Sequence, residues 1–328
     1  VDVVTGVPNY GRDGFFEGYS NSEAREEDWR GARIHRARSV ARGKSKLRLL
    51  LNYITFPVTG SWTALRKVKR RPDVSFVSMP SPPFQALPAI VLRWMRGVPV
   101  VYWVQDIWPE TAIDMLRLKN PIIVKALSAV CGWIFRRADL VLVQSAAFPP
   151  MVARFGIVDE RIRVLPNTAP DMYRPMAPEE APDAQLLMPA GGFRVMFAGN
   201  IGESQDFDTL LATADLLRDR GALHWVIIGS GRDLERVRAR AAELGITDRF
   251  HLLGRHPEET MPGFFAHADA LIVSLRDSDI FNRIVPYKVQ CRSSRPSVAR
   301  ARASSRPRRR GSPHLLPTQG QWPRLSDG

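Results

Sequence analysis

Two carboxylates follow a buried apolar run in the first half of the sequence. Asp106 and Glu110 come directly after residues 98–104, with Trp108 between them. A carboxylate at the end of a buried strand can orient or deprotonate the hydroxyl group of an acceptor molecule, so both are candidate catalytic residues. The structural alternative is that Asp106 caps a helix and Trp108 packs in the core.

Two short glycine-containing loops in the second half suit a phosphate. Gly199, Asn200 and Gly202 follow one predicted strand, and Gly229 and Gly231 follow the next. Glycines let backbone N–H groups approach an anion, and a helix N-terminus favours negative charge. The spacing is not the Gly-x-Gly-x-x-Gly of dinucleotide-binding enzymes. Each loop alone is equally consistent with a tight turn, but two loops at neighbouring strand ends predict a nucleotide diphosphate site.

Three basic side chains complete the candidate site. Arg255 and His256 follow the strand predicted at 250–253, and Lys288 follows Tyr287. A fixed cation such as Lys288 can neutralise a leaving diphosphate, the alternative being a solvent-exposed lysine. The six histidines show no metal-ligand spacing, so we predict no metal site.

The elements that must position these residues alternate along the chain. Most strand candidates are continuously apolar, as parallel strands buried on both faces should be, and helical patterns separate them. Strands are predicted at 1–5, 73–78, 98–104, 140–144, 162–165, 194–198, 224–228, 250–253 and 270–274. Helices are predicted at 44–70, 84–96, 121–137, 146–155, 207–220, 233–244 and 258–267. The pattern predicts an α/β protein with two doubly wound, Rossmann-like domains that bind ligands at the carboxyl ends of their strands.

One interval interrupts the alternation. Residues 166–191 hold six prolines and no apolar periodicity. We therefore predict a first domain at 1–167, whose first strand is missing, a linker at 168–191 and an incomplete second domain at 192–290. Residues 291–328 carry nine Arg and one Asp, which indicates either a disordered basic tail or, the interpretation favoured here, a reading-frame error near Cys291.

Composition and charge narrow the classes of function. The 328 residues are 45% apolar and carry a net charge of +14, and two cysteines exclude a disulfide framework and favour a reducing, cytoplasmic location. No apolar stretch reaches the roughly 18–20 residues of a spanning helix.

Residues 30–71 contain 13 Lys and Arg and no acid, interleaved with aromatic side chains. This block predicts binding to an anionic membrane surface, the alternative being an amphipathic helix that covers the sheet. No nucleic-acid motif accompanies the charge, so nucleic acid is not an expected partner, and a basic nucleic-acid-binding protein remains a non-enzymatic alternative.

Taken in order, these motifs resemble those of family-4 glycosyltransferases of the GT-B fold, most closely the bacterial enzymes that build surface polysaccharides on a lipid carrier. The matching segments are SPP at 81–83, DIWPE at 106–110, LPN at 165–167, GNIG at 199–202, GSG at 229–231, LGR at 253–255 and VPYKV at 285–289.

The resemblance implies a hexose or amino-sugar transfer from a nucleotide sugar, UDP-linked rather than GDP-linked, to a lipid-linked saccharide. It further implies retention at the anomeric carbon, no metal or other cofactor, and an enzyme peripheral to the inner face of the cell membrane. By position, 199–202 would lie near the diphosphate, Gly229 and Gly231 near the ribose or phosphate, and 255–256 near the base. Lys288 would face the donor, and Asp106 the transferred sugar or the acceptor.

The sequence departs from the family pattern at several positions. Asn200 and Gln205 stand where many relatives carry Arg and Lys, and Arg283 and Cys291 stand where a pair of Glu is usual. The first-strand glycine loop is also absent, as expected if that strand is missing. A sugar-nucleotide epimerase of the same fold is the alternative enzyme.

Overall fold

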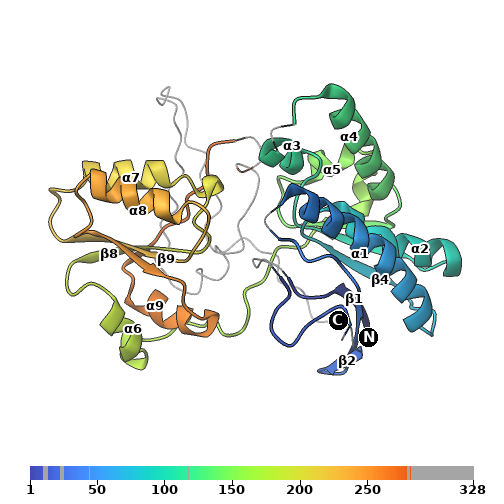
Figure 1. Ribbon diagram of the computed structural model, residues 1–328, viewed down its shortest axis with the longest axis horizontal. Coiled ribbons are helices and arrows are strands. Elements are labelled where there is room, and N and C mark those ends of the chain that lie inside the picture. Colours follow the sequence, from blue (N-terminus) through green and yellow to red (C-terminus); the bar gives the residue numbers. More distant parts are fainter. Residues whose placement is uncertain (10–13, 23–25, 44, 117, 279–280, 282–328) are drawn as a thin grey trace.

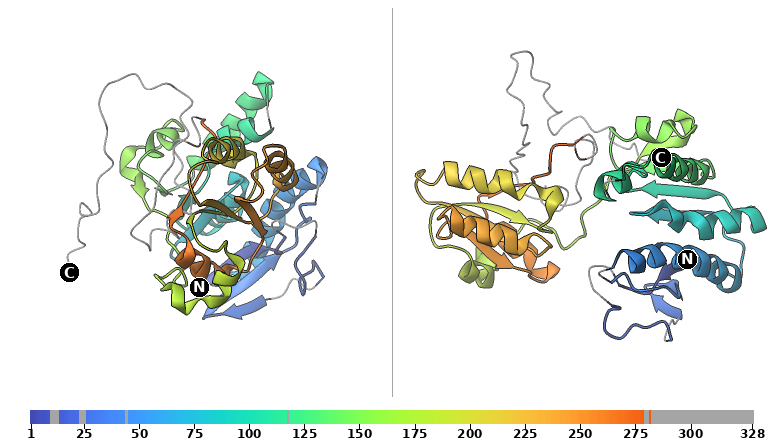
Figure 2. Two further views of the ribbon diagram at one scale, coloured as in Figure 1. Left: turned by 90° about the vertical axis from the view of Figure 1, so that its left-hand side faces the viewer. Right: turned by 45° about the horizontal axis from the view of Figure 1, so that its top comes forward.

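The computed structural model describes residues 1–9, 14–22, 26–43, 45–116, 118–278 and 281. Figures 1 and 2 show two lobes connected by the segment that follows the last strand of the first lobe. The described strands form three sheets, here called sheets A, B and C, with the strand orders β1-β3-β2, β4-β5-β6-β7 and β10-β9-β8-β11.

Sheet A begins the first lobe and was largely missed by the sequence prediction. It consists of β1 (Asp2–Gly6), β2 (Glu26–Trp29) and β3 (Ala32–Ala37), of which only β1 was predicted. β2 and β3 pair antiparallel across a turn in which Arg30 and Gly31 both have positive φ, as a two-residue hairpin turn requires. Arg36 donates two hydrogen bonds to Glu27, of 2.8 and 2.9 Å. Because charged side chains pair with one another along this hairpin, its sequence lacks the apolar alternation that identifies a strand.

Sheet B forms the core of the first lobe. All four strands are parallel and consecutive: β4 (Ser75–Met79), β5 (Val100–Val104), β6 (Leu140–Val143) and β7 (Ile162–Val164). The helices of the lobe are α1 (Lys46–Lys67), η1 (Pro83–Ala86), α2 (Leu87–Arg96), α3 (Glu110–Leu116), α4 (Pro121–Phe135), α5 (Pro149–Ala153) and η2 (Asp159–Arg161).

Only one face of sheet B is fully buried, in contrast to the prediction of strands buried on both faces. Tyr102 and Val141 point into the main core, whereas Trp103 and Leu142, on the opposite face, are half-buried and Phe76 is exposed. Consecutive parallel strands joined by right-handed crossovers place their connecting helices on the same face. The other face of sheet B is therefore left with less cover.

Sheet C forms the second lobe and is buried on both faces. It contains β8 (Phe193–Ala198), β9 (Leu223–Ile228), β10 (Phe250–Gly254) and β11 (Ala270–Leu271). Its helices are η3 (Pro178–Glu180), α6 (Pro182–Leu187), η4 (Glu203–Gln205), α7 (Phe207–Leu216), α8 (Leu234–Glu243), η5 (Glu258–Thr260) and α9 (Met261–His267). Phe197 packs in one core, and Met196 and Ala198 pack in another. α7 and α8 cover one face, and α6 and α9 cover the other, so this lobe is doubly wound as predicted (Figure 1).

The stretch 168–191, predicted as a linker, contains two helical segments. Pro178 and Pro182 are the first residues of η3 and α6, a position where proline is favoured because it has no N–H to leave unpaired. Ala184 and Met188 are buried in the second-lobe core. The prolines therefore start helices that pack on the second lobe, and do not keep the whole stretch extended.

Candidate active site

Asp106 lies in the loop between β5 and α3, at the carboxyl end of sheet B. Burial raises the pKa of its carboxyl group to about 6, and burial is the only cause of this shift. Among the described residues, none forms a hydrogen bond or an ion pair with this carboxylate, so Asp106 does not cap α3 as the structural alternative supposed. A carboxyl group of this kind is suited to accept a proton near neutral pH.

Trp108, two residues after Asp106, connects the loop that follows β5 to the loop that follows β4. Its indole Nε1 donates a 2.8 Å hydrogen bond to Ser81 Oγ, which follows β4. Its ring lies edge-on to Tyr53 and Phe84, with centroids 6.3 and 6.0 Å away. Trp108 therefore packs as a wall of the loop that holds Asp106.

Glu110 has a different environment. It is the first residue of α3, and its carboxylate forms an ion pair with Arg154, which directly follows α5. This contact ties α3 to α5, so any acid–base role of Glu110 competes with the ion pair.

The two glycine loops of the second lobe stack on each other. Ile201 N donates to Ser230 O at 2.9 Å, and Gly199 N donates to Ile228 O at 2.8 Å. A Cβ atom on Gly229 would lie 1.8 Å from Gly199 O, and one on Gly231 would lie 1.9 Å from Ile201 O. The close approach of these backbones explains why glycine occupies 229 and 231, independently of any ligand.

This stacking also decides which backbone N–H groups are free for an anion. Those of Gly199, Ile201 and Gly229 are used inside the protein. Those of Gly202 and Gly231 have no partner among the described residues. The phosphate role predicted for both loops can therefore reside in these two groups.

A further basic side chain, missed in the sequence, reaches the first glycine loop. Arg276 follows β11, and its Nη1 donates to Glu203 Oε1 at 2.8 Å, while its backbone N donates to Ser204 O at 2.9 Å. Asn200 Nδ2 lies 3.3 Å from Gln205 Oε1, so these two residues form an amide pair where relatives carry cations. Arg276 had no signal in the sequence, because only the pairing of β11 with β8 places it there.

The remaining predicted donor-site residues differ in how they are held. Arg255 is exposed after β10 and has no ion-pair partner among the described residues. The His256 ring packs on Phe264, with centroids 4.7 Å apart, and its Nε2 lies 3.2 Å from Leu253 O. Lys288, Arg283 and Cys291, and the predicted tail 291–328, lie outside the described residues.

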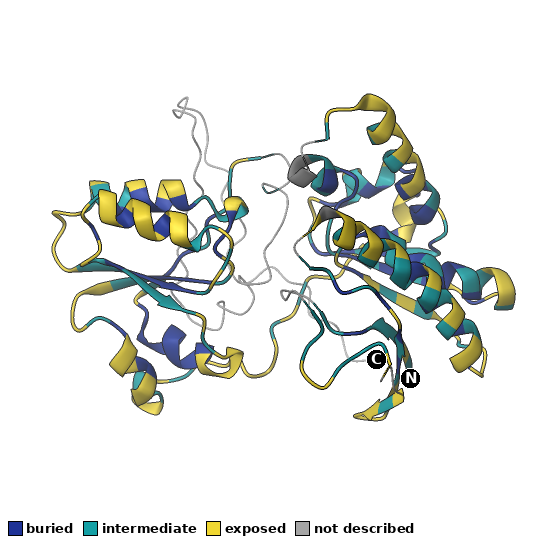
Figure 3. Ribbon diagram, viewed as in Figure 1, coloured by how far each residue is buried: buried dark blue, intermediate teal, exposed yellow. Residues whose placement is uncertain are grey.

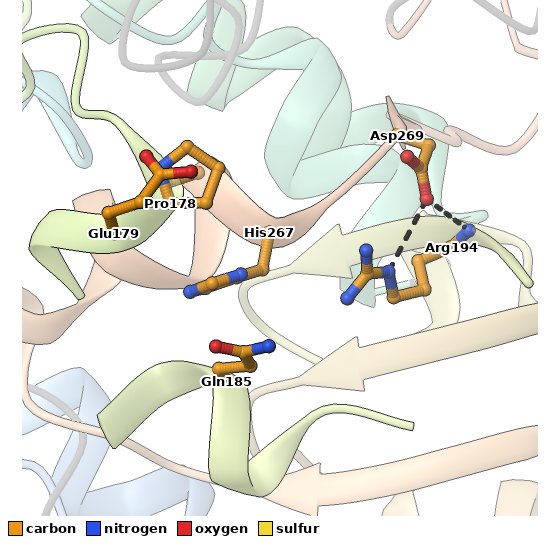
Figure 4. A pocket seen from close by; sticks show the side chains of 7 residues that line it. Pro178, Glu179, Gln185, Arg194, His267 and Asp269 are labelled. Carbon is orange, nitrogen blue, oxygen red and sulfur yellow. Dashed lines mark hydrogen bonds and ion pairs between the residues drawn. The ribbon is translucent and has the colours of Figure 1, made fainter. Parts of the chain in front are cut away.

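A pocket of about 300 Å³ lies at the opposite, amino-terminal edge of sheet C. Figure 4 shows Arg194 and Asp269 on one side of it and His267 and Gln185 on the other. Asp269 accepts hydrogen bonds from Arg194 N and Nε, of 2.7 and 3.4 Å, and His267 Nε2 lies 2.9 Å from Ala181 O. Arg194 and Asp269 thus pair with each other, and β8 separates the pocket from the glycine loops. In the described part of the chain, no three His, Cys, Asp or Glu side chains are grouped to hold a metal ion.

Comparisons with known proteins place both lobes in one superfamily. The family model described as "Glycosyl transferase 4-like domain" matches residues 1–168, and the model described as "Glycosyl transferases group 1" matches residues 179–278. The chain belongs to the family-4 glycosyltransferases. The resemblance to family-4 glycosyltransferases is thus confirmed.

Curated relatives match this chain over about half of its length. It is 25% identical over 170 residues to the 2-deoxystreptamine glucosyltransferase of Streptomyces kanamyceticus, a match that covers 50% of this chain and 42% of the relative. It is 27% identical over 156 residues to the 2-deoxystreptamine N-acetyl-D-glucosaminyltransferase of Streptomyces fradiae, covering 45% of this chain and 37% of the relative. The match thus spans about two fifths of each of these relatives.

Solved structures show the fold of this chain. Sucrose-phosphate synthase from Thermosynechococcus elongatus superposes with a TM-score of 0.63 at 15% identity, covering 84% of this chain and 66% of that one. HepE from Anabaena, in complex with UDP and glucose, superposes with a TM-score of 0.57 at 16% identity, covering 79% and 65%. The predicted GT-B fold is therefore confirmed. In Figure 1, α3, which follows Asp106, lies on the side of the first lobe that is turned toward the second.

Proposed function

We propose that this protein transfers a hexose or amino sugar from a nucleotide sugar to a lipid-linked saccharide, with retention at the anomeric carbon and without a metal. The observation that carries the proposal is the match of both glycosyl transferase family models, in chain order, to the two lobes. These matches favour sugar transfer over the epimerase and the nucleic-acid-binding alternatives.

The second lobe is the proposed donor site, and UDP is the favoured nucleotide. HepE, which shares the fold, was solved with UDP and glucose and with UDP-glucose. In the present chain, the N–H groups of Gly202 and Gly231, which have no partner in the described part of the chain, lie at neighbouring strand ends and precede α7 and α8, respectively. Together with Arg276 and Lys288, they would stabilise the charge that develops on the leaving diphosphate. Arg255 and His256 are proposed to lie near the base.

The first lobe is the proposed acceptor site. Asp106 would orient the acceptor hydroxyl and accept its proton, because its carboxyl group is desolvated and has no partner among the described residues. Glu110 is a weaker candidate, since its carboxylate is already paired with Arg154.

An exposed apolar stripe on α1 supports a membrane location. Large apolar side chains recur every three or four residues and are exposed by 50–66%: Leu47, Leu50, Ile54, Val58 and Trp62. The Arg66 guanidinium lies over the Trp62 ring, 4.0 Å from its centroid, and α1 contains no acidic residue. None of the described helices is long and apolar enough to cross a bilayer. The stripe would instead lie in the interface of an anionic membrane, at its cytoplasmic face, where residues 30–71 would dock the enzyme near its acceptor.

The curated relatives favour a second candidate acceptor. Both are named for transfer to 2-deoxystreptamine, a small soluble aminocyclitol. An amine-bearing acceptor of this kind would also suit an ionised Asp106.

A comparison of donors and acceptors tests the proposal. The full chain is incubated with UDP-glucose, UDP-N-acetylglucosamine or GDP-mannose, and release of the nucleoside diphosphate is measured with a bacterial lipid-linked oligosaccharide extract or with 2-deoxystreptamine. We expect release to be fastest with a UDP-sugar and the lipid extract. Stimulation by 2-deoxystreptamine alone would favour the second candidate. Conversion of the nucleotide sugar to its epimer, without release, would refute transfer.

A further inference from the structure

Gln144 links the loop of Asp106 to the segment that leaves the first lobe. It directly follows β6 and is 5% exposed. Its Nε2 donates a 2.6 Å hydrogen bond to Gln105 O, and its Oε1 accepts a 3.1 Å hydrogen bond from Asn167 Nδ2. A single buried amide thus bridges the carboxyl ends of β5, β6 and β7.

The Gln144 side chain adds a hydrogen bond between β5 and β6 beyond their last backbone pair. The last residue pair between β5 and β6 is Val104 with Val143, so Gln105 has no backbone partner on that side. On its other side, Gln105 N donates to Met79 O at 3.0 Å. Among the described residues, Met79 O therefore holds the backbone N of Gln105, and the side chain of Gln144 holds its backbone O, in the peptide that joins Gln105 to Asp106.

Asn167 lies at the point where the chain passes from one lobe to the other. It comes three residues after the end of β7, and the first family model ends at residue 168. Beyond it, the chain runs to η3, which packs with the second lobe. This segment is a covalent connection through which a displacement of the second lobe can act on the first.

We propose that Gln144 is a positioning residue, which couples the backbone of Gln105 and Asp106 to Asn167 and so to the connection between the lobes. The proposal rests on the proposed role of Asp106 and adds to it a means by which the arrangement of the lobes affects the acceptor site. Gln144 itself touches no reacting atom. Its amide suits the role because it donates and accepts at once, whereas a carboxylate in its place would only accept.

Three variants of the full chain test the coupling: Gln144→Met, Asn167→Ala and the double variant. Met keeps the approximate volume of Gln and removes both hydrogen bonds. Two quantities are measured. The first is the pKa of the Asp106 carboxyl group, from a ¹³C NMR titration in which the Asp106 signal is assigned by its absence in Asp106→Asn. The second is the turnover of UDP-glucose to UDP. The NMR measurement reads Asp106 directly and requires no activity.

We expect Gln144→Met to lower the pKa of Asp106 toward its ordinary value, because a released loop admits water. Turnover should fall about fivefold or more, with the KM for UDP-glucose changed by less than about twofold, since the donor binds the other lobe. Asn167→Ala should have a similar but smaller effect, and the double variant should be no worse than Gln144→Met alone, as expected of residues in one network.

Asn120→Ala is the control for a general loss of stability. Asn120 caps α4 by accepting from the backbone N of Ile122, at 2.9 Å, so its removal costs about 1 kcal/mol away from Asp106. It should lower the melting temperature without moving the Asp106 titration. An Asp106 titration in Gln144→Met identical to that of the wild type would overturn the coupling. If Asp106→Asn keeps full turnover while Gln144→Met shifts the titration, the proposed role of Asp106 fails and the coupling stands.

Discussion

At the scale of single residues, the buried carboxyl group of Asp106 carries a cost in stability that can be measured. Its pKa rises from 3.8 to about 6 on folding, which corresponds to about 3 kcal/mol. Below about pH 4, both the folded and unfolded states hold the proton, and there is no penalty. Between about pH 4 and pH 6 the unfolded carboxyl group is ionised while the folded one still holds its proton, so stability falls across this window, and the full penalty is present above about pH 6.

Asp106→Asn should therefore stabilise the protein while it lowers turnover. We expect the free energy of unfolding to rise by about 1–3 kcal/mol at pH 8 and to change little at about pH 4, because the amide carries no charge to desolvate. Urea unfolding at the two pH values measures this. Turnover should fall with little change in affinity for the nucleotide, and wild-type turnover should decline below about pH 6. Full turnover in the variant would contradict the role of Asp106.

Gly229 is expected to be intolerant of any side chain. In Gly229→Ala, the added Cβ would meet Gly199 O at 1.8 Å, at a φ of 147°. Separating the two loops should cost about 3 kcal/mol or more. Gly245→Ala is the matched control, because Gly245 also has positive φ but nothing lies within 4 Å of the added atom. It should cost about 1 kcal/mol, and equal losses in the two variants by urea unfolding would show that loop stacking is unimportant.

At the scale of elements, the basic block 30–71 divides into two parts. On β3, Arg36 is paired with Glu27, and Arg33 lies 3.1 Å from Asp2. Because these two cations are paired with carboxylates of sheet A, their charge is partly compensated and they contribute little to binding a membrane. On α1, Ala64 is buried against the lobe, whereas the side chains of the apolar stripe are exposed. Figure 3 shows the ribbon of the first lobe coloured by burial. Membrane binding is therefore a property of α1.

Replacing Leu50, Ile54 and Val58 together by Gln should weaken vesicle binding and leave the fold intact. These side chains are exposed in the free protein, so their loss removes about 10-fold or more in membrane affinity at little cost in stability. Flotation with phosphatidylglycerol vesicles and thermal melting measure the two effects. Leu186→Gln with Leu216→Gln is the matched control, because these leucines are 84% and 81% exposed on the second lobe. Equal loss of flotation in both variants would exclude α1 as the docking element.

At the scale of the whole molecule, the net charge of +14 permits binding to any polyanion. Binding to a membrane through α1 should combine charge with apolar burial, so it should persist in part at about 300 mM NaCl, whereas binding to DNA should be lost. Flotation and DNA mobility shift over a series of salt concentrations compare the two. DNA binding that outlasts vesicle binding at high salt would favour the nucleic-acid alternative.

The sequence by itself determined where the strands of sheets B and C lie along the chain and placed the candidate residues at their strand ends. Apolar runs marked β5 and β8 because both strands lie inside a core. Loops that follow such strands necessarily open at the carboxyl edge of a parallel sheet, so Asp106 and Gly199 could be assigned to an edge without any contact being known.

Only the tertiary structure decided which of these residues are free and which are engaged. The pairing of Glu110 with Arg154, the stacking of Gly229 on Gly199 and the bridge from Gln144 to Asn167 all join residues far apart in the chain. The hairpin of β2 and β3 was hidden for a related reason, since the charges of Arg36 and Glu27 compensate each other only once the strands are paired. The apolar pattern of a strand is a local property that can be read from the sequence. Which distant residues become hydrogen-bond or ion-pair partners depends instead on the order of the strands in the sheet.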